Sequence, residues 1–159
     1  MTSRNLKRMI QLADETFAVK NDPDQLDVNP EVMNRLQEMH PSTISDYSDE
    51  NGPIAWVLIF PTTNVLMHRF LSKEISEKEL FFLTPLDVQY DAIYLCSALV
   101  LEEYRRKCIT KQLTLSAIKN IQQQHAIKAL FVWPFSNEGE KGAETIAHLA
   151  LLPLYKRNK

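Results

Sequence analysis

Glycine is scarce in this sequence. Only three of its 159 residues are glycine, whereas average usage would give about eleven. Walker-type phosphate loops and dinucleotide-binding turns need glycines at fixed spacings, because the backbone there approaches a phosphate closely and adopts positive φ. Gly52, Gly139 and Gly142 fit neither spacing. The sequence therefore excludes both kinds of motif.

Cysteines and long apolar runs are also few. The two cysteines, Cys96 and Cys108, form no CxxC pair, and the first residues do not resemble a signal peptide. We therefore expect a reduced, cytoplasmic protein that has no disulfide and no metal site. The longest apolar stretches, at 54–60 and 95–101, are far shorter than the ~20 residues of a membrane span. No membrane partner is expected.

Neither sign of charge is in large excess. The chain carries 18 basic and 20 acidic residues, which gives a net charge of −2. Such a balance provides no overall attraction to nucleic acid, so we expect no nucleic-acid partner. The length suits a single domain over residues 1–159 that buries its own core.

Apolar spacing predicts the elements of the first half of the chain. Helices are expected over 3–20 and 30–39, the second of them started by Asn29-Pro30. The polar, acidic stretch 41–53 is predicted to be a surface loop. A buried strand is expected at 54–60. Residues 65–71 fit either a second strand or a helical turn.

The second half alternates strands and helices. Ser76 and Glu79 form a capping box for a short helix that ends near Thr84. Further elements are expected in the order strand 92–101, helix 105–124, strand 129–133, a helix capped by Ser136-Asn137, and strand 152–156. Strand, helix and strand over 92–133 form a βαβ unit, which requires a parallel pair and a right-handed crossover. The fold class is therefore α/β.

The junction between strand 92–101 and the next helix is the most informative segment. Open α/β sheets bind ligands outside the carboxyl ends of their parallel strands, which is where this junction lies. Four positive charges fall within seven residues there: Arg105, Arg106, Lys107 and Lys111. Together with the free amides of a helix start, they suit phosphate groups. The alternative is an ordinary solvated helix start.

This junction resembles the cofactor motif of the GNAT superfamily of N-acetyltransferases. That motif is a strand, a Pro-Glu-Tyr-like turn, and R/Q-x-x-G-x-G/A at a helix start. The residues that align in register are Val100, Glu103, Tyr104, Arg105, Lys107, Ile109 and Leu113. Cys108 and Thr110 stand where the family has glycine or another small residue. We expect both to keep helical backbone angles and to point their amides at an anion.

The resemblance implies a GNAT-like (acyl-CoA N-acyltransferase) fold, with a mixed central sheet and helices on both faces. It also implies that acetyl-coenzyme A is the co-substrate, that no metal is needed, and that an acetyl or other acyl group passes to a primary amine. The cofactor-binding residues that it implies are Leu99, Val100, Leu101, Arg105, Arg106, Lys107, Cys108, Ile109, Thr110 and Asn137. The backbone at 99–101 would pair with pantetheine.

The resemblance identifies no catalytic residue. Ile146 falls where the family often has a tyrosine that protonates the leaving thiolate. Ser97 could lie beside the thioester or be a buried serine bonded to backbone. His68 and His148 are candidate bases or ordinary surface histidines. The alternative function is therefore a catalytically inactive GNAT-fold module that binds coenzyme A or another protein.

The same resemblance indicates where an acceptor could bind and where a second copy could pair, but it identifies neither the acceptor nor the oligomeric state. In this family the first two helices and their loop border the acceptor site. Residues 21–53 hold one basic residue, Arg35, and eight acidic ones: Asp22, Asp24, Asp27, Glu31, Glu38, Asp46, Asp49 and Glu50. Such a rim would attract a cationic amine, unless it is simply a solvated surface. The family usually continues beyond the last strand found here, so a second copy could complete the sheet edge in a homodimer.

Overall fold

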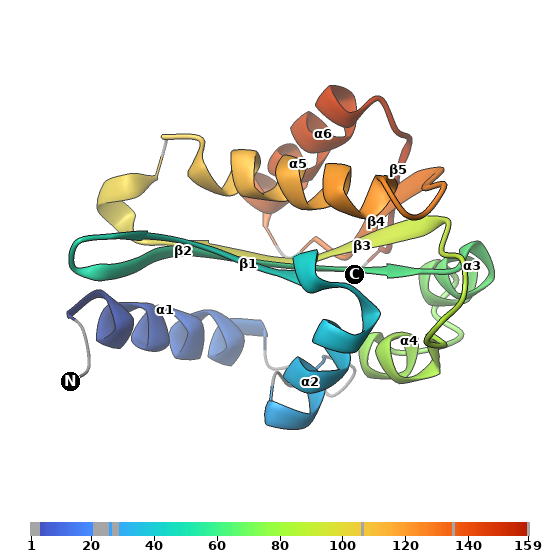
Figure 1. The fold of residues 1–159 in the computed structure, drawn as a ribbon, viewed down its shortest axis with the longest axis horizontal. Coiled ribbons are helices and arrows are strands. Elements are labelled where there is room, and N and C mark those ends of the chain that lie inside the picture. The colour runs from blue at the N-terminus through green and yellow to red at the C-terminus, as the bar shows by residue number, and fades with distance from the viewer. Residues whose placement is uncertain (1–3, 21–25, 27–28, 106, 135, 159) are drawn as a thin grey trace.

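The computed structural model describes residues 4–20, 26, 29–105, 107–134 and 136–158 (Figure 1). The elements follow one another as α1 (Arg4–Lys20), α2 (Pro30–Met39), a 3-10 turn (Pro41–Thr43), β1 (Ile44–Asp49), β2 (Gly52–Thr62), α3 (Asn64–Leu71), α4 (Glu77–Leu83), β3 (Ala92–Val100), a second 3-10 turn (Glu102–Tyr104), α5 (Ile109–Gln122), β4 (Ala129–Val132), α6 (Asn137–Ala150) and β5 (Leu154–Lys156).

The strands form one mixed sheet of five strands, in the order β1-β2-β3-β4-β5. The first three strands pair antiparallel, whereas β3, β4 and β5 pair parallel. Helix α5 connects β3 to β4 and α6 connects β4 to β5, as parallel neighbours require. The structure therefore confirms the expected α/β class, the mixed sheet and the parallel βαβ unit.

Helices cover both faces of the sheet, as expected (Figure 1). α5 and α6 lie on one face, and α1, α2 and α4 lie on the other. Ile118 and Ala147 bring α5 and α6 into a core with Val57 and Leu130 of the sheet. On the opposite face, α1 packs through Met9 into a separate cluster beside β2 and β3. Each face of the sheet therefore has its own apolar core.

Three helix starts have the caps that the sequence predicts. The Asn29 side chain accepts a hydrogen bond from Val32 N–H at the start of α2. Ser76 and Glu79 form the complete capping box of α4, and the Ser136 hydroxyl accepts from Gly139 N–H in α6. Each cap satisfies an amide that the helix itself leaves without an acceptor.

The prediction of a loop over 41–53 was wrong. Residues Ile44–Asp49 form β1, which turns at Glu50-Asn51 and pairs antiparallel with β2. β1 is an edge strand with the exposed run Asp46, Tyr47 and Ser48, so it lacks the apolar alternation by which a strand is recognised. Residues 65–71, which fit either a strand or a helical turn in sequence, belong to helix α3. The Thr63 side chain caps this helix by accepting a hydrogen bond from Leu66 N–H.

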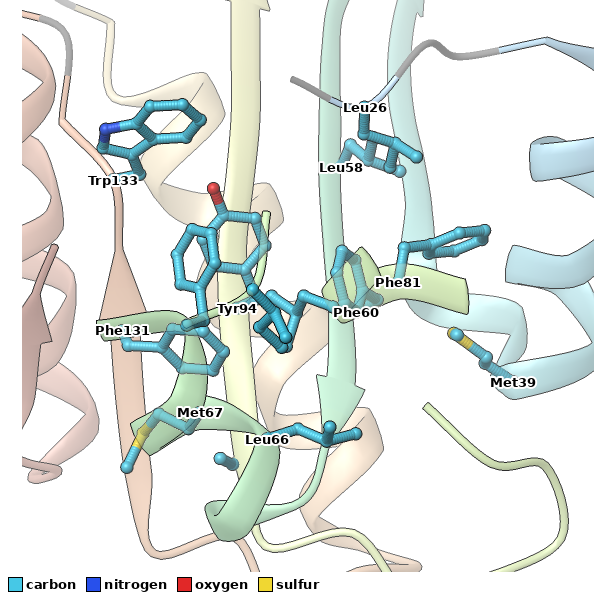
Figure 2. Packing of buried hydrophobic residues seen from close by; sticks show 14 of the residues in the cluster. Leu26, Met39, Leu58, Phe60, Leu66, Met67, Phe81, Tyr94, Phe131 and Trp133 are labelled. Atoms are coloured by element: carbon cyan, nitrogen blue, oxygen red, sulfur yellow. The ribbon is translucent and has the colours of Figure 1, made fainter. Parts of the chain in front are cut away.

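The core beneath α3 and α4 is aromatic (Figure 2). Tyr94 lies between Phe60 and Phe131, with ring centroids 5.3 and 5.0 Å away. Its hydroxyl donates to Glu77 Oε2, while Glu77 Oε1 accepts from Leu26 N–H at 2.7 Å. Burial first, and then the charge of Glu77, raise the pKa of Tyr94 well above its ordinary range. This buried carboxylate therefore joins α4, β3 and Leu26.

Two histidines lie together where α2 and α5 end. His40 Nδ1 accepts from Ser42 N–H at 3.0 Å, and His125 Nδ1 accepts from Tyr90 N–H at 3.2 Å. Their ring centroids are 6.4 Å apart. Burial lowers the pKa of both side chains from the ordinary value of 6.5. Protonation at either Nδ1 would also remove a backbone hydrogen bond.

We predict that acid destabilises the protein through this pair. The unfolded chain protonates these histidines near pH 6.5, whereas the folded chain resists protonation. Their contribution to stability is therefore complete above that pH and is lost as the pH falls through the lower folded values. Urea unfolding at about pH 7.5 and about pH 5.5 measures the loss. His125→Gln should reduce this loss, whereas His148→Gln, at an exposed position of α6, should not. Equal loss in all three proteins would contradict the prediction.

Candidate functional site

β3 and β4 separate partway along β3. Their parallel pairing runs from Ala92 with Ala129 to Leu95 with Val132, where β4 ends. β3 continues to Val100 beside β2, with a register shift that leaves Cys96 as a bulge. Beyond Leu95, no residue of β4 pairs with β3 in the described chain. One edge of β3 is therefore open over its second half.

The open edge presents the backbone of two residues. Leu101 N–H donates to Ile54 O at 2.9 Å, so it faces β2. Alternate residues of a strand direct their backbone groups to opposite edges, so Leu99 also faces β2. Ala98 and Val100 face the opening. Of the residues expected to pair with a cofactor, Val100 directs its backbone to the opening, whereas Leu99 and Leu101 direct theirs to β2. Strand alternation would have pointed to Ala98 as well.

An outer cleft of about 830 Å³ lies beside this edge. The starts of α5 and α6 both reach it, through Thr110 and through Ser136 and Gly139. Other residues that line the outer cleft are Leu12, Ala98, Leu99, Val100, Glu102, Arg105 and Glu138. A helix start carries about half a positive charge, so the convergence of two starts favours an anion.

An inner cavity of about 320 Å³ adjoins the outer cleft, between the sheet and helices α5 and α6. The two spaces share Ala98, Thr110, Ser136, Glu138 and Gly139. The rest of the lining is mainly apolar and includes Val57, Ile59, Leu95, Val132, Trp133, Pro134, Gly142, Ala143 and Ile146, together with the hydroxyl residue Thr114. Ser97 and Cys96 also line this cavity, where β3 and β4 separate.

Cys108 adopts the left-handed conformation at the start of α5, with φ 60° and ψ 22°. The expectation that it keeps helical angles was wrong, and so was the expectation of a helix from about Arg105, because α5 begins only at Ile109. Thr110 is helical, as expected. A left-handed backbone costs a residue with a side chain roughly 1–2 kcal/mol. A glycine at this position would avoid that cost.

The first amides of α5 are not capped by a side chain. Cys108 makes no cap hydrogen bond, and the first intrahelical bond runs from Gln112 N–H to Cys108 O. Within the described chain, no acceptor meets the N–H groups of residues 109–111. These amides are available to an anion.

The positive charges near α5 are divided between two sides of the loop. Arg105 lines the outer cleft. Lys107 lies in a separate groove beside β1, with Nζ 5.4 Å from the centre of the Tyr104 ring. Arg106 lies outside the described residues. Because Glu102 and Glu138 also line the cleft, its attraction to an anion depends on backbone amides more than on net charge.

Polar contacts hold this loop against α1 and the β1–β2 hairpin. Tyr104 Oη donates to Asp49 Oδ2 at 2.6 Å, and Asn5 Nδ2 donates to Asp49 Oδ1 at 2.8 Å. Arg8 pairs with Glu103 through both guanidinium nitrogens. The Tyr104 hydrogen bond lowers the pKa of Asp49, and Arg8 lowers the pKa of Glu103 to about 2. The loop is therefore positioned by segments far away in the sequence.

The remaining candidate residues lie elsewhere. Ile109 is half-buried beside the Met9 cluster. Asn137 is exposed in a small groove with Glu140 and Lys156, so in the described chain Ser136, and not Asn137, lines the cleft. His68 and His148 are exposed on α3 and α6. Neither histidine lines the outer cleft or the inner cavity as the structure describes them.

The acidic stretch does not gather around the cleft. Asp46 and Asp49 are on β1 and Glu50 is in the turn that follows, whereas Glu31 and Glu38 are on α2. None of these five lines the described outer cleft or inner cavity. Asp22, Asp24 and Asp27 lie outside the described residues. Glu102 and Glu138, which the sequence did not single out, are the acidic residues of the cleft.

Comparison of the sequence with protein-family models and with curated proteins finds no match. None of the described helices combines the length and the hydropathy that crossing a membrane requires. The described part of the chain also brings together no group of three or more His, Cys, Asp or Glu residues that could hold a metal ion.

We predict opposite effects of glycine at the two positions of the motif. Cys108→Gly should raise the free energy of unfolding by about 0.5–1 kcal/mol. Glycine removes the cost of the left-handed backbone, but it also gives the unfolded chain more conformational entropy, which cancels part of this stabilisation. Thr110→Gly should lower it by a few tenths of a kcal/mol, because Thr110 is helical. Chemical denaturation measures both changes.

Leu151 provides the matched control. It also has left-handed angles, with φ 59°, and is 88% exposed after α6, so Leu151→Gly should stabilise the protein as well. A loss of stability in Cys108→Gly beside a gain in Leu151→Gly would contradict this account of residue 108.

Proposed function

We propose that this protein is an acyl-coenzyme A-dependent N-acyltransferase with a GNAT-like fold. The observation that carries the proposal is the open second half of β3, which lies in one cleft with the starts of α5 and α6. An extended arm that carries amides at one end and phosphates at the other matches this arrangement. Coenzyme A has that chemistry.

Each part of the cleft has a role in this proposal. The free N–H groups at 109–111 would bind the pyrophosphate, and Arg105 would pair with a phosphate. The outward backbone groups of Ala98 and Val100 would pair with the amides of pantetheine, as an added strand does. The acyl end would then lie where Ala98 lines both the outer cleft and the inner cavity.

The reaction would be direct transfer. The amine nitrogen attacks the thioester carbonyl, a C–N bond forms and the C–S bond breaks, and the proton of the amine passes to the coenzyme A thiolate. A backbone N–H at the open edge of β3 would stabilise the charge that develops on the carbonyl oxygen. This role needs no side chain, which suits a cleft built mainly from backbone.

A second candidate is a module that binds coenzyme A without transferring its acyl group. The observation that favours it is Ile146, which lines the inner cavity where the family often has its proton-donating tyrosine. Thiol release from an acyl-coenzyme A across a panel of primary amines separates the two. Release that depends on an amine supports the transferase, and binding without release supports the module.

We predict that coenzyme A stabilises the protein through Arg105. At about a hundred times its Kd, coenzyme A should raise the melting temperature by roughly 5–10 °C. Arg105→Glu should weaken binding at least about tenfold, because it places a carboxylate beside the phosphates. Thermal shift and isothermal titration calorimetry measure these effects.

Lys107→Glu is the control, because it makes the same charge change in the neighbouring groove. This variant should retain most of the shift. Absence of any shift in the natural protein at millimolar coenzyme A would contradict the proposal. An equal loss in both variants would contradict the assigned role of Arg105.

A further inference from the structure

We propose that the acyl group taken by this protein is a straight chain longer than acetyl, and that the inner cavity holds it. This inference rests on the proposed function, since it concerns the acyl end of the same co-substrate. It follows from the size, the lining and the position of the cavity.

The cavity is too large for acetyl alone. An acetyl group ends in one methyl group, which is about the size of a water molecule, and a water takes up ~30 Å³ in the liquid. The inner cavity measures about 320 Å³, roughly ten times as much. It also follows α6 from Glu138 to Ile146, a rise of ~12 Å at 1.5 Å per residue.

The lining of the cavity is mainly apolar, and its charged residue, Glu138, lies at the end shared with the outer cleft. Ser136, Glu138 and Thr110 belong to the end shared with the outer cleft. The side chains that belong to the inner cavity alone include Val57 and Ile59, which are 2% and 1% exposed, and two hydroxyl residues, Ser97 and Thr114. The Thr114 hydroxyl already donates to Thr110 O. A mainly apolar lining favours an apolar ligand. An alkyl chain attached to a polar thioester fits this lining, whereas a polar amine does not.

One residue of the α6 lining has no side chain. Gly142 is exposed and lines the cavity, and a Cβ atom added there would meet no atom within 4 Å. Glycine is a poor residue in the middle of a helix, and this one is not at a turn. A larger side chain at 142 therefore has room without a clash, and from a position in the lining it can occupy part of the cavity.

The experiment measures binding of free coenzyme A and of its acetyl, butyryl and hexanoyl thioesters to the full chain by isothermal titration calorimetry. Affinity should rise by about fourfold for each methylene that the cavity covers. Gly142→Leu should bind free coenzyme A as tightly as the natural protein does. It should lose most of the increase in affinity that longer acyl chains give the natural protein. Thr145→Leu adds the same side chain at an exposed position of α6 and should keep the gain.

Each outcome has a separate meaning. Equal affinity for the acetyl and hexanoyl thioesters, in a protein that binds free coenzyme A, overturns the inference and leaves the proposed function in place. A chain-length gain that persists in Gly142→Leu also overturns it, because the chain then binds elsewhere. Failure of the natural protein to bind free coenzyme A or any thioester overturns the proposed function and this inference together.

Discussion

The end of β4 at Val132 determines the rest of the site. Because β3 runs on to Val100 without β4 beside it, half of its edge keeps backbone groups that pair with no parallel neighbour. The helices that follow β3 and β4 must start near this edge, because each leaves the carboxyl end of its strand. An open strand edge and two helix starts thus come together as a consequence of one short strand.

The loop between β3 and α5 depends on contacts that are distant in sequence. Tyr104 bonds to Asp49 in the β1–β2 hairpin, and Glu103 bonds to Arg8 in α1. Leu101 also packs toward α1, in the apolar cluster around Met9. The hairpin and α1 therefore help to fix the position of the loop that carries Arg105 into the outer cleft.

Local signals in the sequence were sufficient to predict the helices with side-chain caps, the apolar strand β3 and the parallel βαβ unit around α5. They were insufficient for β1, whose residues 46–48 are exposed at the edge of the sheet and show no alternation. The left-handed angle of Cys108 was missed because a side chain at positive φ leaves no pattern in a sequence. Arg105 and Lys107 lie in different grooves because of how the loop turns between them. The spacing of charges along the sequence does not predict that turn.

Four described residues other than glycine have positive φ, namely Lys73, Asp87, Cys108 and Leu151. A cysteine in this conformation has fewer alternative backbone angles than a glycine would have. Cys108 therefore has less backbone freedom to lose than a glycine at the same position. If an anion binds the first amides of α5, the conformational entropy lost at this residue is correspondingly smaller.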